Sequence, residues 1–230
     1  MHPVRALRFL SLATFAAFLP ALALAQGGIY GAVQGDRYLS PTGTFSIKIP
    51  VLPELGGSLN DTPTVVTFQD QFTLHASIAC FRMDATQRWE HSTRGTRDYL
   101  VWFFGNFVQT DFRERFPDAR IQSANFLPGL ATGTLLVYNL LPGGTMFPDR
   151  IAFTDNQRVP VAKRGNLVFV HDEYIYVIST ELAERVIQTR TWEKTTSEED
   201  ELLRNRLLRL LRDMTFTTPL PPLAAPAARS

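Results

Sequence analysis

Two neighbouring segments in the C-terminal half of the chain are apolar on both of their alternating faces. Residues 167–170 and 174–178 consist almost entirely of branched and aromatic residues, and Asp172-Glu173 lies between them. Successive side chains of a β-strand point to opposite faces, so a strand that is apolar in both directions is buried on both. The pair therefore predicts a hairpin inside a sheet that is covered on two sides, with Asp172-Glu173 as a turn that lacks the glycine such turns prefer.

Further strands are predicted on both sides of a central helical region. Residues 45–49 alternate and stop at Pro50, which is typical of a half-exposed strand near a sheet edge. Residues 65–68, 72–83, 120–126 and 133–139 are also rich in strand-forming residues. In the segment 72–83 one face carries Ala76, Ile78 and Cys80, and the other carries His75 and Ser77. This alternation predicts that Cys80 faces the core and that His75 lies on a polar sheet surface.

Two helices are predicted from apolar residues at helical spacing. The first covers residues 93–116, with Leu100, Phe103 and Phe107 on its stripe and Pro117 at its end. Val101, Val108 and Phe112 widen the stripe, which predicts cover on more than one side. The second begins at a capping box, Ser197-Glu198-Glu199-Asp200, and continues through one apolar stripe. The members of that stripe are Leu203, Leu207, Leu210, Leu211 and Met214.

The two ends of the chain differ in character from the region between them. Arg5 and Arg8 precede an apolar run that ends at Ala23-Leu24-Ala25, the pattern of a Sec-type signal peptide cleaved before Gln26. We assign residues 1–25 to this signal, 26–37 to an N-terminal linker, 38–216 to a single domain and 217–230 to a disordered tail rich in proline and alanine. The expected location is periplasmic or secreted, with no membrane-integral segment after cleavage. The excess of arginine over lysine favours a bacterial source.

Cleavage of the signal gives a direct prediction. The exported protein should have an intact mass that corresponds to residues 26–230, because Ala23 and Ala25 provide the small side chains that a signal peptidase site needs. Mass spectrometry that finds residues 1–25 still attached would contradict it.

The segments at the start and end of the domain resemble those of the PsbP-like family, which comprises the extrinsic subunit of photosystem II and its exported bacterial relatives. The resemblance rests on residues 38–50, on the hairpin of residues 165–178, and on a final helix that runs into Met214-Thr215-Phe216. It implies an α+β fold, an α/β/α sandwich around a mainly antiparallel sheet, and a binding or assembly role without catalysis. The family's tryptophan after Pro50 is absent, and no metal-binding residue can be carried over.

Composition excludes several classes of function. The formal net charge is +1, and removal of Arg5 and Arg8 makes the mature chain slightly acidic. A nucleic-acid-binding protein would instead need clustered positive charge. The single cysteine excludes a disulfide framework. The sequence contains no nucleophile elbow, no zinc-protease motif, no phosphate-binding loop and no dinucleotide fingerprint.

One set of residues could carry chemistry if the fold brought it together. His75 and His171 lie in predicted strands, and Asp172 and Glu173 follow His171 directly. In neighbouring strands, two imidazoles with a carboxylate could bind a divalent metal or move a proton. The simpler interpretation is that both histidines are polar residues at a sheet surface.

The sequence therefore predicts an exported, non-enzymatic binding or accessory protein that needs no cofactor and has an unknown protein or small-molecule partner. One alternative is a metal-dependent or hydrolytic periplasmic enzyme that uses His75 and His171. Another is a carrier of a small apolar ligand, built from the aromatic helix and the Met146-Phe147 loop. That alternative requires a cavity of a few hundred cubic ångströms.

Overall fold

The main sheet is antiparallel and has seven strands. The computed structural model describes residues 29–72, 74–130, 133–146, 161–188, 191–218 and 220. The strand order is β4-β5-β6-β10-β9-β8-β7. The strands are β4 (Ser58–Asp61), β5 (Val65–Gln69), β6 (His75–Arg82), β10 (Tyr174–Glu181), β9 (Val161–His171), β8 (Thr134–Pro142) and β7 (Arg120–Leu127).

The predicted central hairpin is confirmed. β9 and β10 pair through Asp172-Glu173, and both strands are buried along most of their length. Asp172 and Glu173 have φ values of 47° and 60°. Positive φ at both central residues is what the right-handed twist of a two-residue hairpin requires, so here two acidic residues take the conformation that glycine usually supplies.

A second, four-stranded sheet has the order β1-β2-β3-β11. Its strands are β1 (Ala32–Gln34), β2 (Arg37–Leu39), β3 (Phe45–Lys48) and β11 (Met214–Phe216). β1 and the start of β2 fall within residues 26–37, so part of the segment assigned to the linker belongs to the domain. Strands of only three residues are too short to give an alternating apolar signal, which is why the sequence does not reveal them.

One face of the main sheet is covered by a helical run. It consists of α1 (Ala85–Arg94), α2 (Thr96–Phe103), the π-helical turn η2 (Phe104–Val108) and α3 (Gln109–Arg115). The predicted helix of residues 93–116 corresponds to α2, η2 and α3, which begin at Thr96, after Gly95. α1 is not predicted, because it buries no residue and so carries no apolar stripe. Its sequence signal is the Asp84–Gln87 capping box. Cover on more than one side is also wrong, since Val101 and Phe107 are exposed.

The opposite face is covered by α5 (Thr196–Asp213). Its predicted apolar stripe is confirmed: Leu203, Leu207 and Leu210 are buried. The capping box lies two residues earlier than predicted, because Thr195 is the N-cap and Glu198 completes the box. The helix lies close to the sheet at Gly165, where a β-carbon would come within 3.1 Å of Leu203 and Leu207.

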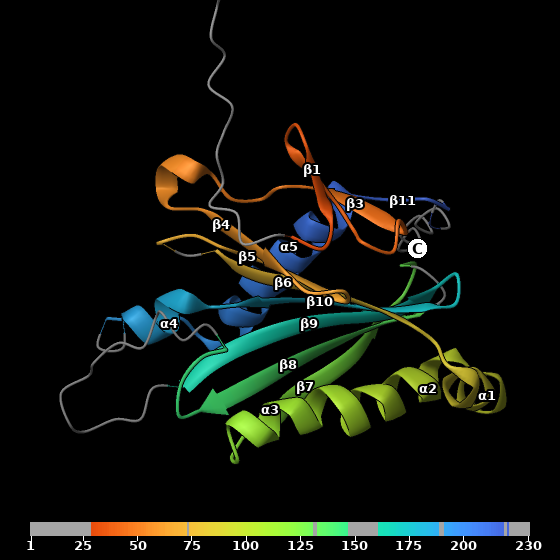
Figure 1. Cartoon of the computed structure of the whole chain (residues 1–230). Helices are drawn as coiled ribbons and strands as arrows, with labels where there is room; N and C mark the ends of the chain where they lie inside the picture. The colour runs from red at the N-terminus through yellow and green to blue at the C-terminus, as the bar shows by residue number, and fades with distance from the viewer. Residues whose placement is uncertain are drawn as a thin grey trace, which may run out of the picture.

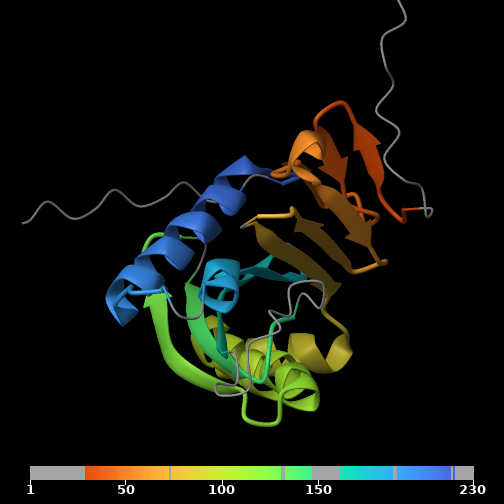
Figure 2. The same ribbon diagram turned by 90° about the vertical axis from the view of Figure 1, so that its left-hand side faces the viewer.

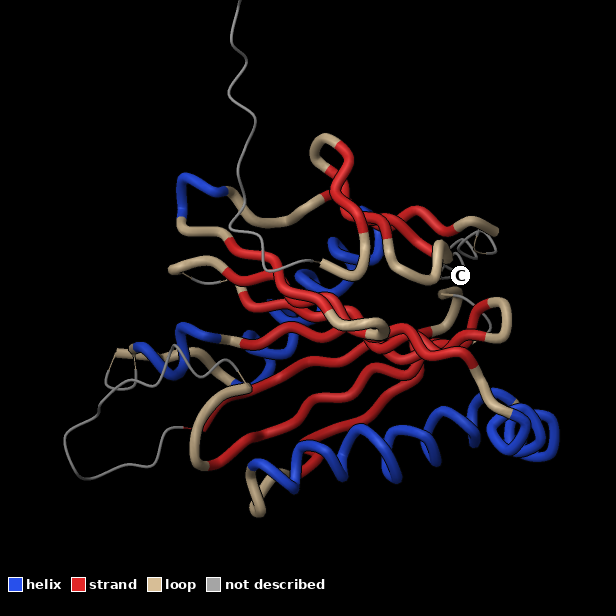
Figure 3. The backbone as a smooth tube through the Cα atoms, viewed as in Figure 1, coloured by secondary structure: helices blue, strands red, loops and turns tan. Residues whose placement is uncertain are grey.

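The predicted fold class is confirmed as a mixed α+β architecture. Figure 1 shows α1, α2 and α3 on one side of the main sheet, and Figure 2 shows α5 and the smaller sheet on the other. Figure 3 shows how strongly the strands of the main sheet twist and curl between these layers. The remaining helices, η1 (Pro53–Leu55) and α4 (Ala183–Ile187), are short. Among the described residues, no helix has both the length and the apolar character needed to cross a membrane.

The first residues of the predicted tail pack on the domain. The Thr217 N–H donates to the Thr44 carbonyl at 3.0 Å, and the Thr218 carbonyl lies 2.6 Å from His171 Nε2. Leu220 packs against the core. The predicted start of the tail at residue 217 is therefore too early. The proline and alanine content of the segment does not reveal the contacts that Thr217, Thr218 and Leu220 make with the domain. Residues 221–230 and the predicted signal at 1–25 lie outside the described residues.

Candidate functional site

A groove of about 890 Å³ lies between one part of the main sheet and the helical run. α2 packs over β8 and β9, whereas β4, β5 and β6 form the far part of the same curled sheet (Figure 1). The floor of the groove is formed by Asn60, Val65, Thr67, Gln69, Ser77, Ala79, Phe81, Arg164, Val177 and Ser179. Its wall and rim are formed by Arg82, Asp84, Gln87, Phe103, Phe107, Val108, Asp111, Phe112, Arg115 and Met146.

The floor changes from apolar to polar along the strands. Val65, Ala79 and Val177 lie in register across β5, β6 and β10 and form an apolar rung. Two residues further, Thr67, Ser77 and Ser179 form a polar rung, which Asn60 on β4 extends. Side chains two residues apart point to the same face. The groove therefore has an apolar half and a polar half.

The helical wall follows the same gradient. Phe103 packs against Phe81 at the apolar half, with ring centroids 6.4 Å apart. One turn further, Phe107 lines the groove and is 46% exposed. Phe112 lies at the polar half, because its ring centroid is 5.6 Å from the guanidinium carbon of Arg164.

The π-helical turn η2 sits in the middle of this wall. It runs from Phe104 to Val108 and interrupts an otherwise α-helical run. A π-turn contains an extra residue, and such turns occur often at functional sites. Here the turn includes Phe107 and Val108, and both line the groove.

A buried ion pair closes the polar half. Arg164 Nη1 lies 3.3 Å from a Glu181 carboxylate oxygen, and Arg164 Nη2 donates to Ser77 Oγ at 2.8 Å. Glu181 also accepts hydrogen bonds from the Thr145 hydroxyl and the Met146 N–H. Burial raises the pKa of the Glu181 carboxyl, and Arg164 opposes that rise. Burial likewise lowers the pKa of the Arg164 guanidinium, and Glu181 opposes that fall. Each charge thus depends on the other.

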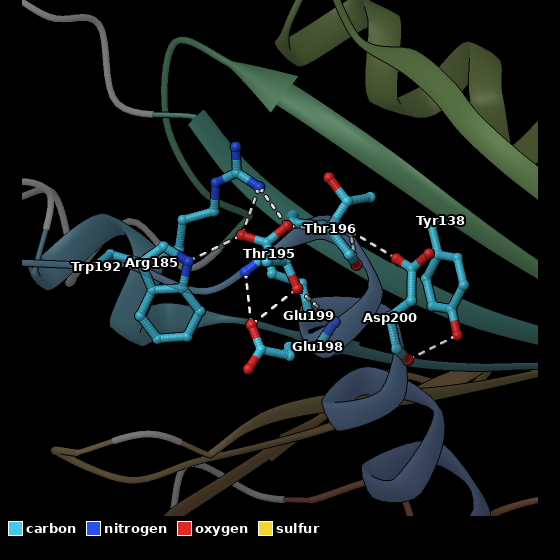
Figure 4. Close-up of polar contacts among 9 residues, drawn as sticks. Tyr138, Arg185, Trp192, Thr195, Thr196, Glu198, Glu199 and Asp200 are labelled. Carbon is cyan, nitrogen blue, oxygen red and sulfur yellow. Dashed lines mark hydrogen bonds and ion pairs between the residues drawn. The ribbon is translucent and has the colours of Figure 1, made fainter.

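A second charged cluster lies on the opposite face of the sheet, under the first turn of α5. Lys163 is fully buried and lies 3.0 Å from Glu199 and 2.6 Å from Asp200. Arg185 and the indole of Trp192 donate to the same Glu199 carboxylate, and Figure 4 shows them converging on it. Tyr138 donates to the Asp200 carbonyl, and burial raises the pKa of Tyr138 to about 12. This cluster joins the start of α5 to β9 and does not line the groove.

The structure does not bring the predicted metal-binding residues together. His75 begins β6, whereas His171 ends β9 beside Tyr174, which pairs with Arg82 at the far end of β6. Seven residues of strand separate the two positions, which corresponds to about 23 Å. Asp172 and Glu173 form the exposed hairpin turn near His171 alone. Among the described residues, no group of three or more His, Cys, Asp or Glu side chains could hold a metal ion.

The environment of His75 also differs from the prediction. The alternation correctly separates His75 from the Cys80 face, and Cys80 is buried as expected. However, His75 is only 1% exposed and is not a surface residue. A polar side chain in an alternating strand pattern therefore does not by itself indicate contact with water. Burial raises the pKa of the Cys80 thiol, which favours the inert, protonated form.

The groove was only partly accessible to sequence reasoning. The aromatic helix and Met146 were named for the apolar-carrier alternative, and both line the groove. Phe147, the other residue of that loop, lies outside the described residues. The sequence does not identify Arg164, Ser77 and Ser179 as site residues, because only the strand order shows that these three polar side chains lie together.

Comparisons with known proteins give distant structural likeness. The structure is similar to the solution structure of cyanobacterial PsbP from Synechocystis sp. PCC 6803, with a TM-score of 0.46 and 11% identity over 81% of this chain and 98% of that one. It is also similar to a crystal structure from Bacteroides thetaiotaomicron VPI-5482, with a TM-score of 0.38 and 11% identity over 81% of this chain. The chain spans half the length of the Bacteroides protein. No family model and no curated protein matches the sequence.

Proposed function

We propose that the protein is a non-enzymatic binding module that holds one small amphipathic molecule in the groove. The observation that carries this proposal is a groove of about 890 Å³ whose floor passes from an apolar rung to a polar rung. Ligand sites commonly measure 300–1,000 Å³ and combine apolar walls with a few polar groups. Of the two partner classes expected from the sequence, a protein or a small molecule, this proposal selects the small molecule. We also propose that the protein is exported.

The apolar half would supply most of the affinity. Phe81, Phe103 and Phe107 present aromatic surface to the groove, and Val65 and Val177 complete it. Each methylene moved from water into such an environment contributes about 0.8 kcal/mol. A chain of eight to ten carbons therefore gains roughly 6–8 kcal/mol, which is of the same order as the free-energy cost of the freedom lost on binding.

The groove chemistry favours binding over catalysis. A covalent mechanism needs a nucleophile within hydrogen-bond reach of a base. Ser77 accepts a hydrogen bond from Arg164, and Ser179 donates one to Asn166. The lining residues of the described chain include neither histidine nor cysteine. Of the carboxylates, Asp84 caps α1, Asp111 pairs with Arg115, and the neighbouring Glu181 pairs with Arg164.

A neutral fluorescent dye tests the proposal. N-phenyl-1-naphthylamine emits strongly only in apolar surroundings, so the purified protein should bind it with saturation at one equivalent. Ala79→Phe adds a ring at the middle of the apolar rung and should weaken dye binding by at least tenfold. Val65→Trp, on the neighbouring strand, should act in the same direction.

The matched control is Ala124→Phe on β7, an exposed strand position that does not line the groove. It should leave dye affinity unchanged, and thermal unfolding of all variants should confirm that they are folded. Dye binding that is absent in the wild type, or that is equal in Ala79→Phe and Ala124→Phe, would contradict the proposed function.

A further inference from the structure

The polar half of the groove indicates which kind of head group the bound molecule carries. This inference rests on the proposed function. We propose that the bound molecule carries an uncharged hydroxyl or amide group, and that this group sits on the rung formed by Thr67, Ser77 and Ser179. The argument comes from the charges near this rung and from the hydrogen-bonding roles left to its two serines.

The charges at the polar half are paired with one another. Arg164 pairs with Glu181 at 3.3 Å, and on the wall Arg115 pairs with Asp111 at 4.0 Å. Each pair contains one cation and one anion, so their formal sum is zero. A ligand charge of either sign would meet a like charge as well as an opposite one, so the repulsion from the first offsets attraction to the second.

Recruiting Arg164 to an anionic ligand would carry a large cost. The carboxylate of Glu181 is fully buried, and Arg164 is its cationic partner. An anionic ligand that paired with Arg164 would compete with Glu181 for the guanidinium. A buried carboxylate that loses its compensating charge is strongly destabilised. An uncharged group avoids this competition.

The two serines provide one donor and one acceptor. Ser77 and Ser179 are in register on β6 and β10, which places their β-carbons about 4.5–5.5 Å apart. Ser77 Oγ accepts from Arg164, so its own hydrogen can be donated to a ligand. Ser179 donates its hydrogen to Asn166, so its oxygen can accept one.

This combination matches an alcohol or an amide. Both groups can donate and accept hydrogen bonds, so either can satisfy Ser77 and Ser179 together. A carboxylate only accepts, and a primary ammonium only donates, so each would leave one serine unsatisfied. A quaternary ammonium does neither. Thr67 and Asn60 extend the rung with further hydrogen-bonding groups for the same head group.

Three molecules with ten-carbon chains test the inference below their micellar concentrations. Isothermal titration calorimetry should show that 1-decanoylglycerol binds at least tenfold more tightly than decanoate or decyltrimethylammonium. Ser179→Ala removes the acceptor, so it should reduce this preference to within about threefold, and thermal unfolding should show that the variant is folded. Ser123→Ala on β7, away from the groove, should keep the full preference.

The outcomes separate the two proposals. If decanoate or decyltrimethylammonium binds as tightly as 1-decanoylglycerol, the head-group inference is overturned and the binding function stands. The same holds if the dye binds and all three amphiphiles do not. If neither the dye nor any amphiphile binds to the folded protein, the proposed function itself fails.

Discussion

Replacing Glu199 with leucine is expected to lower the free energy of unfolding by about 3–5 kcal/mol. This is the usual cost of removing one partner of a buried ion pair. Lys163 is fully buried, and Glu199 is one of its two carboxylate partners. The same carboxylate accepts hydrogen bonds from Arg185 and Trp192. The substitution therefore leaves positive charge under the first turn of α5 with only Asp200 to compensate it. Urea unfolding followed by circular dichroism measures the loss.

The control for this variant is two residues away. Glu201 is on the same helix but exposed, so Glu201→Leu should change the free energy of unfolding by less than about 0.5 kcal/mol. A domain of this size has about 5–15 kcal/mol in total, so the Glu199 variant should be visibly less stable. A loss of less than 1 kcal/mol would show that the cluster does not hold α5 to the sheet.

Replacing Arg164 with methionine should have a comparable effect that depends on pH. Without the guanidinium, the Glu181 carboxylate is buried and uncompensated, which costs about 3–5 kcal/mol near neutral pH. Burial already raises the pKa of Glu181, and loss of Arg164 raises it further. A carboxyl whose pKa is higher in the folded than in the unfolded state takes up a proton on folding, so stability falls as the pH rises.

The loss caused by Arg164→Met should thus be smaller at pH 4.5 than at pH 8, because at the lower pH folded Glu181 is protonated. The double variant Arg164→Met/Glu181→Leu removes both charges and should recover most of the stability at pH 8. Thermal unfolding at the two pH values measures both effects. A loss that is the same at both pH values, with no recovery in the double variant, would mean that the ion pair is not responsible.

The parts of the fold that follow from the sequence are those with strong periodic burial. The hairpin of β9 and β10 and the stripe of α5 are predicted correctly, because residues 167–170, residues 174–178 and the stripe of α5 are apolar and mostly buried. β1, β2 and β4 are missed, because short strands with exposed or half-buried residues carry little pattern. α1 is missed for the same reason, although Asp84 and Gln87 mark its start.

The candidate site could be predicted only in its apolar part. Phe103 and Phe107 stand out in the sequence, but core packing explains an aromatic helix equally well until the exposure of Phe107 is known. Ser77 and Ser179 are about a hundred residues apart, and only strand pairing puts them side by side. For His75 and His171, the sequence suggests a site that the structure does not form. Their residue type suggested chemistry, and the strand register separates them.

The most direct test of the binding function is to locate a bound molecule on the protein by NMR. Titration of isotopically labelled protein with N-phenyl-1-naphthylamine should shift backbone amide signals of β5, β6, β10 and the run from Phe103 to Arg115, which surround the groove. Signals of α5 and of the sheet formed by β1, β2, β3 and β11 should stay in place. Shifts confined to α5 or to that smaller sheet, or no shifts at saturating dye, would contradict a ligand site in the groove.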